Sequence, residues 1–489
     1  MSEQGRQWAI IQGDAREVLA GMDDQSVHCV VTSPPYFGLR SYGTPPLLWG
    51  GPDECEHEWD GEYRPAESKA RGERPELTGG GATSWSTRDG TTDNAKGQFC
   101  RLCGCWRGSL GLEPDPAMYI SHLVDIFRAV RRVLRDDGTL WLNIAGCYAG
   151  SWGNYHPTGT GGQRPKSTER YERPAYASRD FLPPTANVSS FKPKDWIPIP
   201  WMLGMALQAD GWWLRSPIIW AKGLSFCEEY SGGMMPESVR DRPTTSYEYV
   251  LLLTKAKTYF YDGDAVKEVS VTNDPRRPYT SQGAWQMDAR PEAQQRGGER
   301  RNGDDFSGRN LRSVWALNPE PQRLQHYASF PTALVEPCIK AGSSERGCCS
   351  SCGTGWIRVV EKKGGTLGQS WHDHADDSSK GMTQTQEGIP LATWKGRKER
   401  ENPYTTATLG WRPGCECYAK EWMHDERAEI STESCTVLDP FSGSGTTVMV
   451  ALRLGRRAIG IDLNEAYCQM ARTRIIEDNP MFNTPMEAR

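Results

Sequence analysis

The stretch Val437–Thr447, VLDPFSGSGTT, does most to decide the fold. Its apolar residues predict the end of a buried strand, its two glycines a tight turn, and the residues after Gly445 the start of a helix. Glycines let the backbone approach a ligand closely, and a helix N-terminus offers free N–H groups. Asp462 ends the next predicted strand, where a carboxylate accepts hydrogen bonds from ribose hydroxyls. The unit predicts a ribose-bearing ligand, and a glycine-rich turn without a ligand is the alternative.

Strands and helices also alternate outside this unit. The predicted strands are Trp8–Gln12, Val27–Thr32, Thr139–Ile144, Pro217–Trp220, Tyr249–Leu253, Cys435–Leu438 and Arg457–Ile461. Apolar residues at helical spacing predict helices over Met118–Leu134 and Thr446–Leu454. Because strands that alternate with helices form a largely parallel sheet covered on both faces, we expect the α/β class.

Composition excludes several other classes. The 489 residues include 57 Lys and Arg against 62 Asp and Glu, for a net charge of −5. This balance gives no global sign of nucleic-acid binding, so such a function depends on local features. The sequence contains no apolar run of the roughly 18 residues that a membrane helix needs, and its first residues lack the apolar core of a signal peptide. We therefore expect an intracellular protein with a compact core and long polar insertions.

A second motif, SPPY, follows the predicted strand Val27–Thr32 directly. Its two prolines fix the backbone and remove two N–H donors, which leaves the Ser33 hydroxyl, rigid carbonyls and the ring of Tyr36. Such oxygens accept hydrogen bonds from the exocyclic amino group of an extruded base, while the ring stacks on the face of that base. A plain Pro-Pro turn is the alternative for this tetrapeptide alone. Its pairing with the glycine loop favours the base-binding interpretation.

TSPPY followed much later by DPFSGSGTT resembles the permuted site-specific DNA amino-methyltransferases of restriction–modification systems and phages. In that family the catalytic motif precedes the cofactor motif. The resemblance implies a Rossmann-like fold with a mostly parallel seven-stranded sheet, and S-adenosyl-L-methionine (AdoMet) as the methyl donor. It also implies methyl transfer to the exocyclic amino nitrogen of a flipped base in double-stranded DNA. Serine at the first motif position favours cytosine-N4, and adenine-N6 is the alternative.

A dinucleotide is the rival ligand for the glycine loop, which has only two of the three fingerprint glycines. The family resemblance also implies partners and a compartment. A cognate restriction endonuclease is a candidate partner besides DNA. The expected location is the bacterial cytoplasm, or the host cytoplasm for a phage-encoded chain.

The resemblance assigns roles to individual residues. The catalytic residues are Ser33, Pro34, Pro35 and Tyr36. The cofactor-binding residues are Asp14, His326, Phe330, Pro331, Asp439, Pro440, Phe441, Gly443, Gly445, Thr446 and Asp462. Segments Arg215–Lys222 and Tyr247–Leu253 resemble those that form the target-base side. The family usually has Phe where Tyr327 stands, which is a mild departure.

Fifteen cysteines, several of them closely spaced, favour metal binding in a chain without marks of secretion. The first predicted zinc site consists of Cys55, His57, Cys100 and Cys103, with Cys105 as a competing ligand. The second consists of Cys349, Cys352, Cys415 and Cys417, where Cys348 could replace Cys349. Closed four-ligand sites of this kind are structural rather than catalytic. Free buried cysteines are the alternative for each cluster.

These assignments divide the chain into a core and insertions. The methyltransferase core comprises 1–50, 110–150, 190–270, 310–345 and 430–475. The other parts are a zinc-knuckle insertion (51–109), a basic and aromatic insertion (151–189), an Arg-rich flexible loop (271–309), a zinc-ribbon-like insertion (346–429) and a tail (476–489). The basic segments 150–190 and 276–312 and the zinc modules are candidates for reading DNA, since Arg and Lys neutralise phosphates or bind guanine edges. Solvated loops are the alternative.

Two other classes of function are weaker. An AdoMet enzyme that acts on RNA, protein or small molecules is opposed by the serine form of the motif, the permuted order and the basic insertions. A non-catalytic zinc-bearing DNA-binding protein is opposed by the intact residues Ser33–Tyr36, Asp439, Gly443, Gly445 and Asp462.

Overall fold

The structure is a computed structural model that describes residues 7–38, 44–60, 63, 97–149, 191–192, 194–227, 230, 232–233, 237, 239–268, 309–320, 330–363, 405–417 and 431–478. Within this part of the chain, no helix is both long enough and apolar enough to cross a membrane.

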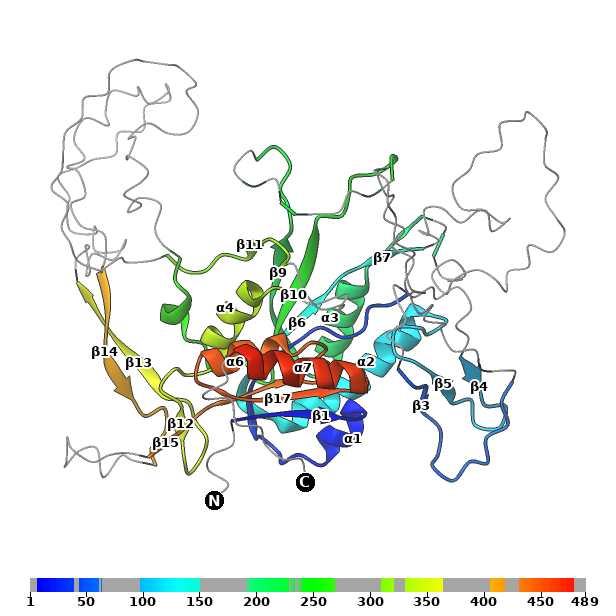
Figure 1. Ribbon diagram of the computed structural model, residues 1–489, viewed down its shortest axis with the longest axis horizontal. Coiled ribbons are helices and arrows are strands. Elements are labelled where there is room, and N and C mark those ends of the chain that lie inside the picture. The colour runs from blue at the N-terminus through cyan, green and yellow to red at the C-terminus, as the bar shows by residue number, and fades with distance from the viewer. Residues whose placement is uncertain are drawn as a thin grey trace, which may run out of the picture.

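One large sheet forms the centre of the described part (Figure 1). Its eight strands, in spatial order, are β1 (Trp8–Gln12), β17 (Arg457–Asp462), β16 (Thr436–Asp439), β2 (Val27–Thr32), β6 (Leu134–Ile144), β10 (Tyr247–Thr254), β9 (Trp213–Ala221) and β11 (Val314–Ala316). All neighbouring pairs are parallel except the two that β10 makes. Only β10 therefore runs against the other described strands, and the expected mostly parallel α/β sheet is confirmed.

The expectation of seven strands is wrong, because β11 adds an eighth at the edge. This strand has three residues, pairs with β9, and buries only the side chain of Trp315. A strand this short has no periodicity that could mark it in the sequence.

Helices cover both faces of the sheet (Figure 1). One face carries α1 (Ala15–Ala20), α2 (Pro116–Val133) and α3 (Ile199–Ala209), and the other carries α4 (Thr332–Gly342), α6 (Thr446–Arg453) and α7 (Glu465–Asp478), with the 3₁₀ turn η4 (Gly263–Val266) beside α4. Strand side chains alternate between the two cores: Leu140 and Leu142 join the first, and Trp141 joins the second. This period of two is the property of a pleated strand that buries both of its faces.

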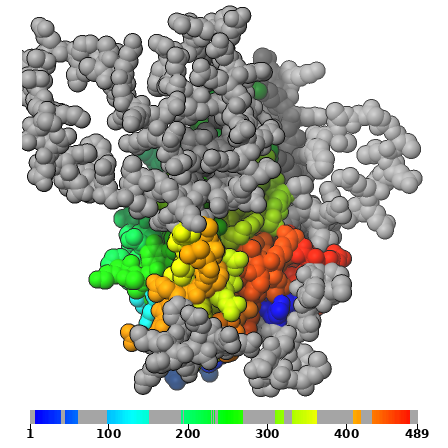
Figure 2. All heavy atoms as spheres, turned by 90° about the vertical axis from the view of Figure 1, so that its left-hand side faces the viewer, coloured from blue at the N-terminus to red at the C-terminus, as the bar shows by residue number. Residues whose placement is uncertain are grey.

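The remaining strands form small sheets at the sides. They are β3 (Leu47–Trp49), β5 (Trp106–Gly108) and β4 (Gln98–Phe99); β7 (Cys147–Tyr148) with β8 (Trp196–Ile197); β12 (Cys348–Cys349) with β15 (Thr432–Glu433); and β13 (Ile357–Lys363) with β14 (Thr405–Arg412). Figure 2 looks onto the side of the molecule that carries β13 and β14. Strand β3 belongs to the predicted core segment 1–50, yet it pairs with β5 of the predicted insertion 51–109.

Candidate active site

A pocket opens at the carboxyl edge of the sheet, where the loops after the neighbouring strands β1, β17, β16 and β2 meet. Ligands of open α/β sheets bind at this edge. Of the predicted site residues, the structure brings Asp14, Ser33, Pro34, Pro35, Tyr36, Pro440, Phe441, Gly443 and Asp462 into the lining of this pocket. The two motifs, which lie at opposite ends of the chain, therefore share one cavity.

The glycine loop is shaped by its own backbone and by Asp462. Gly443 and Gly445 have positive φ angles of 51° and 76°, a region that favours glycine. The Gly443 N–H donates to Asp462 Oδ2 at 2.8 Å, and the Asn464 N–H donates to Oδ1 of the same carboxylate at 2.8 Å. Burial raises the pKa of Asp462. The carboxylate thus orders the loop and still has lone pairs for a ligand in the pocket.

Asp439 points into the protein rather than into the pocket, and its side chain is only 1% exposed. Its Oδ1 accepts hydrogen bonds from the Thr32 hydroxyl at 2.6 Å and from the Phe441 N–H at 3.1 Å. Burial raises the pKa of Asp439 to about 6. Because Thr32 precedes the SPPY motif and Phe441 belongs to the glycine loop, this carboxyl joins the two motifs. A direct contact of Asp439 with cofactor stays a prediction.

Asp14 begins α1 and accepts a hydrogen bond from the Arg16 N–H at 2.9 Å. The Arg16 guanidinium also pairs with the Asp14 carboxylate at 2.6 Å. The same guanidinium donates to the Leu48 carbonyl at 3.0 Å and lies 4.1 Å from the centre of the Trp49 ring. Arg16 therefore connects a pocket carboxylate to strand β3.

The hydroxyl of Tyr36 is the centre of a polar network on the opposite side of the pocket. It donates to Glu248 Oε2 at 2.6 Å and accepts from Asn143 Nδ2 at 2.9 Å and from the Ser33 hydroxyl at 3.3 Å. Asn143 also donates to Glu248 Oε2 at 2.9 Å, and Lys222 forms an ion pair with Glu248. Since the Ser33 hydroxyl donates to Tyr36, the lone pairs of its oxygen can accept a hydrogen bond from a substrate.

This network contains functional candidates that the motifs did not single out. Glu248, Lys222 and Asn143 come from β10, the residue after β9, and β6. Two signs were present in the sequence: Lys222 and Glu248 lie in the segments that resemble the target-base side, and Glu248 is a charged residue between two tyrosines in the otherwise apolar run YEYVLLL. The pairing of that residue with Tyr36, 212 positions away, has no local signature.

The other predicted cofactor residues lie outside the pocket lining. Gly445 and Thr446 begin α6, and the Thr446 hydroxyl oxygen accepts from the Arg474 side chain at 2.7 Å. Phe330 packs in the core on the α4 side, and Pro331 precedes α4. His326 lies outside the described residues. For these residues a contact with cofactor stays a prediction.

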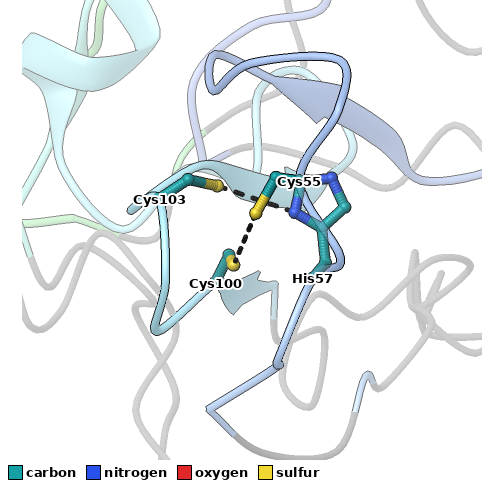
Figure 3. A group of neighbouring side chains, drawn as sticks. All are labelled: Cys55, His57, Cys100 and Cys103. Atoms are coloured by element: carbon teal, nitrogen blue, oxygen red, sulfur yellow. Dashed lines mark hydrogen bonds between the residues drawn. The ribbon is translucent and has the colours of Figure 1, made fainter.

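The first predicted metal cluster is gathered beside β4 and β5 (Figure 3). The ligand atoms of Cys55, His57, Cys100 and Cys103 all lie within 4.8 Å of one another. Cys55 Sγ is 3.9 Å from Cys100 Sγ, and Cys103 Sγ is 3.6 Å from His57 Nδ1. Cys105 Sγ lies 3.5 Å from the same nitrogen, so it remains a competing ligand. Three thiols and one imidazole are a donor set that Zn²⁺ prefers.

The second predicted cluster lies at the base of the β13–β14 hairpin. The ligand atoms of Cys349, Cys352, Cys415 and Cys417 also lie within 4.8 Å of one another. The backbone around this cluster contacts the start of the central strands: His28 Nε2 is 2.8 Å from the Gly353 carbonyl. Four thiols again fit Zn²⁺.

A third group, His28, Cys348 and Cys435, is equally close-packed. Both ring nitrogens of His28 are already bonded to backbone, Nδ1 accepting from the Thr436 N–H at 3.0 Å and Nε2 facing the Gly353 carbonyl. This histidine has no nitrogen left for a metal. Cys348 belongs to this group and not to the second cluster, so the structure favours Cys349 as the ligand there.

Comparison with known proteins identifies the family of this chain. A family model of DNA methylases, of the N6/N4 type, matches residues 27–363 and 428–473. The chain belongs to this DNA methylase family. The Type II methyltransferase M.SmaI of Serratia marcescens is 30% identical over 473 residues, which cover 96% of this chain and 91% of that protein. M.Cfr9I, a Type II methyltransferase of Citrobacter freundii, is 32% identical over 334 residues, 68% of this chain and 72% of that protein. Among solved structures, the chain is also similar to the PvuII DNA methyltransferase, with 11% identity and a TM-score of 0.41 over 98% of this chain and 93% of that one.

Proposed function

We propose that this DNA methylase transfers the methyl group of AdoMet to the exocyclic N4 amino group of a flipped cytosine in duplex DNA. The main support for the proposal is the shared pocket, because the glycine loop and the SPPY motif follow neighbouring strands and line one cavity. The reaction requires that a donor and an acceptor meet in line at short distance, and a common cavity supplies that proximity.

The cofactor side of the pocket suits a nucleoside. Asp462 ends β17 at the pocket and would accept from ribose hydroxyls, while Gly443 leaves room for close approach of the ligand. When bound, AdoMet supplies an electrophilic methyl group on a sulfonium, which is a good leaving group.

The base side of the pocket suits an amino group. The Ser33 oxygen and the Pro34 carbonyl would accept the two amino hydrogens, which shifts electron density onto the nucleophilic nitrogen. The ring of Tyr36, held through its hydroxyl by Glu248 and Asn143, would stack on the flipped base. As the N–CH₃ bond forms, the S–CH₃ bond of AdoMet would break and the amino nitrogen would become cationic. It would then release a proton to water, so no strong general base is needed.

Cytosine-N4 is preferred over adenine-N6 because serine stands at the first position of the motif. The test is to incubate the protein with unmodified duplex DNA and AdoMet labelled in the methyl group, and then digest the DNA to nucleosides. Label in N4-methylcytosine supports the proposal, and label in N6-methyladenine replaces it with the adenine alternative. Ser33→Ala serves as the low-activity control.

We propose two structural Zn²⁺ ions as further cofactors, one held by each four-ligand cluster. The division into a core and insertions at the boundaries given above is also a proposal, as are a cognate restriction endonuclease and a cytoplasmic site of action. Segment 150–190 and most of segment 276–312 lie outside the described residues. Of the second segment, the described Arg309 and Arg312 both pair with Glu268. Contact of the two segments with DNA stays a prediction. Elemental analysis by mass spectrometry should find two zinc ions per chain, and a value far below two would remove this part of the proposal.

A further inference from the structure

The first metal cluster and the AdoMet pocket are joined by one small antiparallel sheet. Strand β3 pairs with β5, so that Trp49 lies opposite Trp106, and β4 pairs with the other edge of β5. Cys100 follows β4 directly, and Cys103 stands three residues before β5 begins. The metal ligands therefore connect the strands of this sheet (Figures 1 and 3).

The outer strand of the same sheet forms part of the pocket wall. Leu47 and Trp49 of β3 both line the pocket. Trp49 is 3% exposed, its indole N–H donates to the Gly108 carbonyl of β5 at 3.1 Å, and its ring stacks on His122 of α2 at 4.3 Å. The position of this wall thus depends on β5 and on α2.

The β3 wall also contacts Arg16, the residue that pairs with the Asp14 carboxylate of the pocket. Arg16 binds the Asp14 carboxylate and, with the same guanidinium, the Leu48 carbonyl of β3. If β3 moves, Arg16 loses its backbone partner and its packing on Trp49. Arg16 then keeps only the Asp14 carboxylate as a partner, so the guanidinium that pairs with this carboxylate is held less firmly in place.

Hydrogen bonds alone hold such a sheet weakly. Strands β3 and β5 have three residues each and β4 has two, whereas independently stable sheets need longer strands. A metal that binds four ligands around this sheet contributes its binding free energy to the folding of the sheet.

The second cluster is placed differently. Its backbone contacts His28, near the start of β2, and the Arg135 side chain donates to the Cys352 carbonyl at 2.8 Å. The pocket lies at the other end of β2, after Thr32. The ligands of neither cluster line the pocket, but β3 beside the first cluster does, whereas among the described residues none of the strands β12, β13, β14 and β15 beside the second cluster does.

We propose that the metal ion of the Cys55–His57–Cys100–Cys103 cluster fixes the β3 wall of the pocket, so that this metal and AdoMet bind cooperatively, while the metal of the second cluster does not take part. The inference rests on the proposed binding of AdoMet in this pocket. Coupling between two ligands is reciprocal, so AdoMet also retains the metal of the first cluster.

The test compares Cys55→Ser with Cys415→Ser, two half-buried ligands from the two clusters. Zinc content is measured by mass spectrometry and AdoMet affinity by calorimetry, both on the full-length protein. Each variant should lose one zinc ion. We expect the AdoMet dissociation constant to rise about tenfold or more in Cys55→Ser and to change less than about twofold in Cys415→Ser. Cys227→Ser, outside both clusters, should retain both zinc ions and the affinity of the wild type.

A second measurement needs no variant. A zinc-binding dye is added in excess to the wild-type protein, with and without AdoMet, and metal release is followed over time. AdoMet should slow the release of one zinc ion and leave the other unchanged. Equal release with and without AdoMet, or an unchanged AdoMet affinity in zinc-depleted Cys55→Ser, overturns the coupling. A wild-type protein that binds no AdoMet would instead refute the proposed function itself.

Discussion

Asp439→Asn should change the pH dependence of stability without a large change in shape. The side chain is buried, and its Oδ1 accepts hydrogen bonds from Thr32 and from the Phe441 N–H. An asparagine keeps an oxygen in that position but carries no charge at any pH. The variant therefore isolates the cost of placing a carboxylate in the interior.

The size of the effect follows from the pKa of Asp439, which burial raises from 3.8 to about 6. In the folded protein the neutral form is favoured, so the penalty is absent below the unfolded value of 3.8. It grows as the pH rises through that range and is complete above the folded value. The difference corresponds to about 3 kcal/mol, since each pKa unit is worth about 1.4 kcal/mol.

Urea unfolding of wild type and variant at a series of pH values from about 4 to about 8 measures this difference. The other titrating groups are the same in both proteins and cancel when the two free energies of unfolding are subtracted. The variant should gain about 2.4 kcal/mol relative to wild type between about pH 4 and about pH 8, because roughly 0.6 kcal/mol of the penalty is already present at about pH 4. A difference that stays constant within about 1 kcal/mol across the series would refute the assignment of a buried, destabilised carboxylate.

Three further changes probe the pocket and the glycine loop beside it. Glu248→Gln removes the charge that holds the Tyr36 hydroxyl, so the single-turnover rate of methyl transfer should fall about 10- to 100-fold while the AdoMet affinity stays unchanged. An equal loss of AdoMet affinity would contradict a role confined to the base side of the pocket. Gly445→Ala places a Cβ at a residue with φ 76° and 2.9 Å from Ala471 Cβ, so urea unfolding should show that the free energy of unfolding falls by about 1–3 kcal/mol. An unaltered free energy of unfolding would mean that the loop adjusts freely. Asp462→Asn should weaken AdoMet binding about tenfold or more in calorimetry, and a wild-type affinity would exclude the ribose contact.

The sequence predicts those parts of the fold and the site that depend on residues close together in the chain. The strand, glycine turn and helix of 436–453 follow from residues that are neighbours in sequence, and the same holds for the turn at Ser33–Tyr36. Paired spacings of cysteine also identified two sets of residues that the structure brings together. These features need little tertiary information, because short segments fix their own geometry.

Other features depend on contacts across the chain and were not predictable. A carboxylate at a strand end can face a ligand or the interior, and only the partner Thr32, 407 positions from Asp439, decides the direction. The predicted core segment 1–50 includes Leu47–Trp49, whereas the hydrogen-bonding partner of this strand is β5 of the predicted insertion. The network around Tyr36 likewise forms only because strands β6, β10 and β9 are neighbours, so the contact of Glu248 with Tyr36 cannot be predicted from the sequence around either residue.

The strand order of the central sheet has a consequence for how the protein is made. Strands β16 and β17 lie between β1 and β2, so strands that come late in the chain take interior positions in a sheet whose other strands are synthesised earlier. Until β17 is available, β1 has no neighbour in the sheet. Pairings over such separations close slowly, because a long loop must be ordered first. Shortening the protein from its C-terminal side would therefore split the sheet rather than trim its edge, and a nascent chain contains the SPPY motif well before it contains the glycine loop.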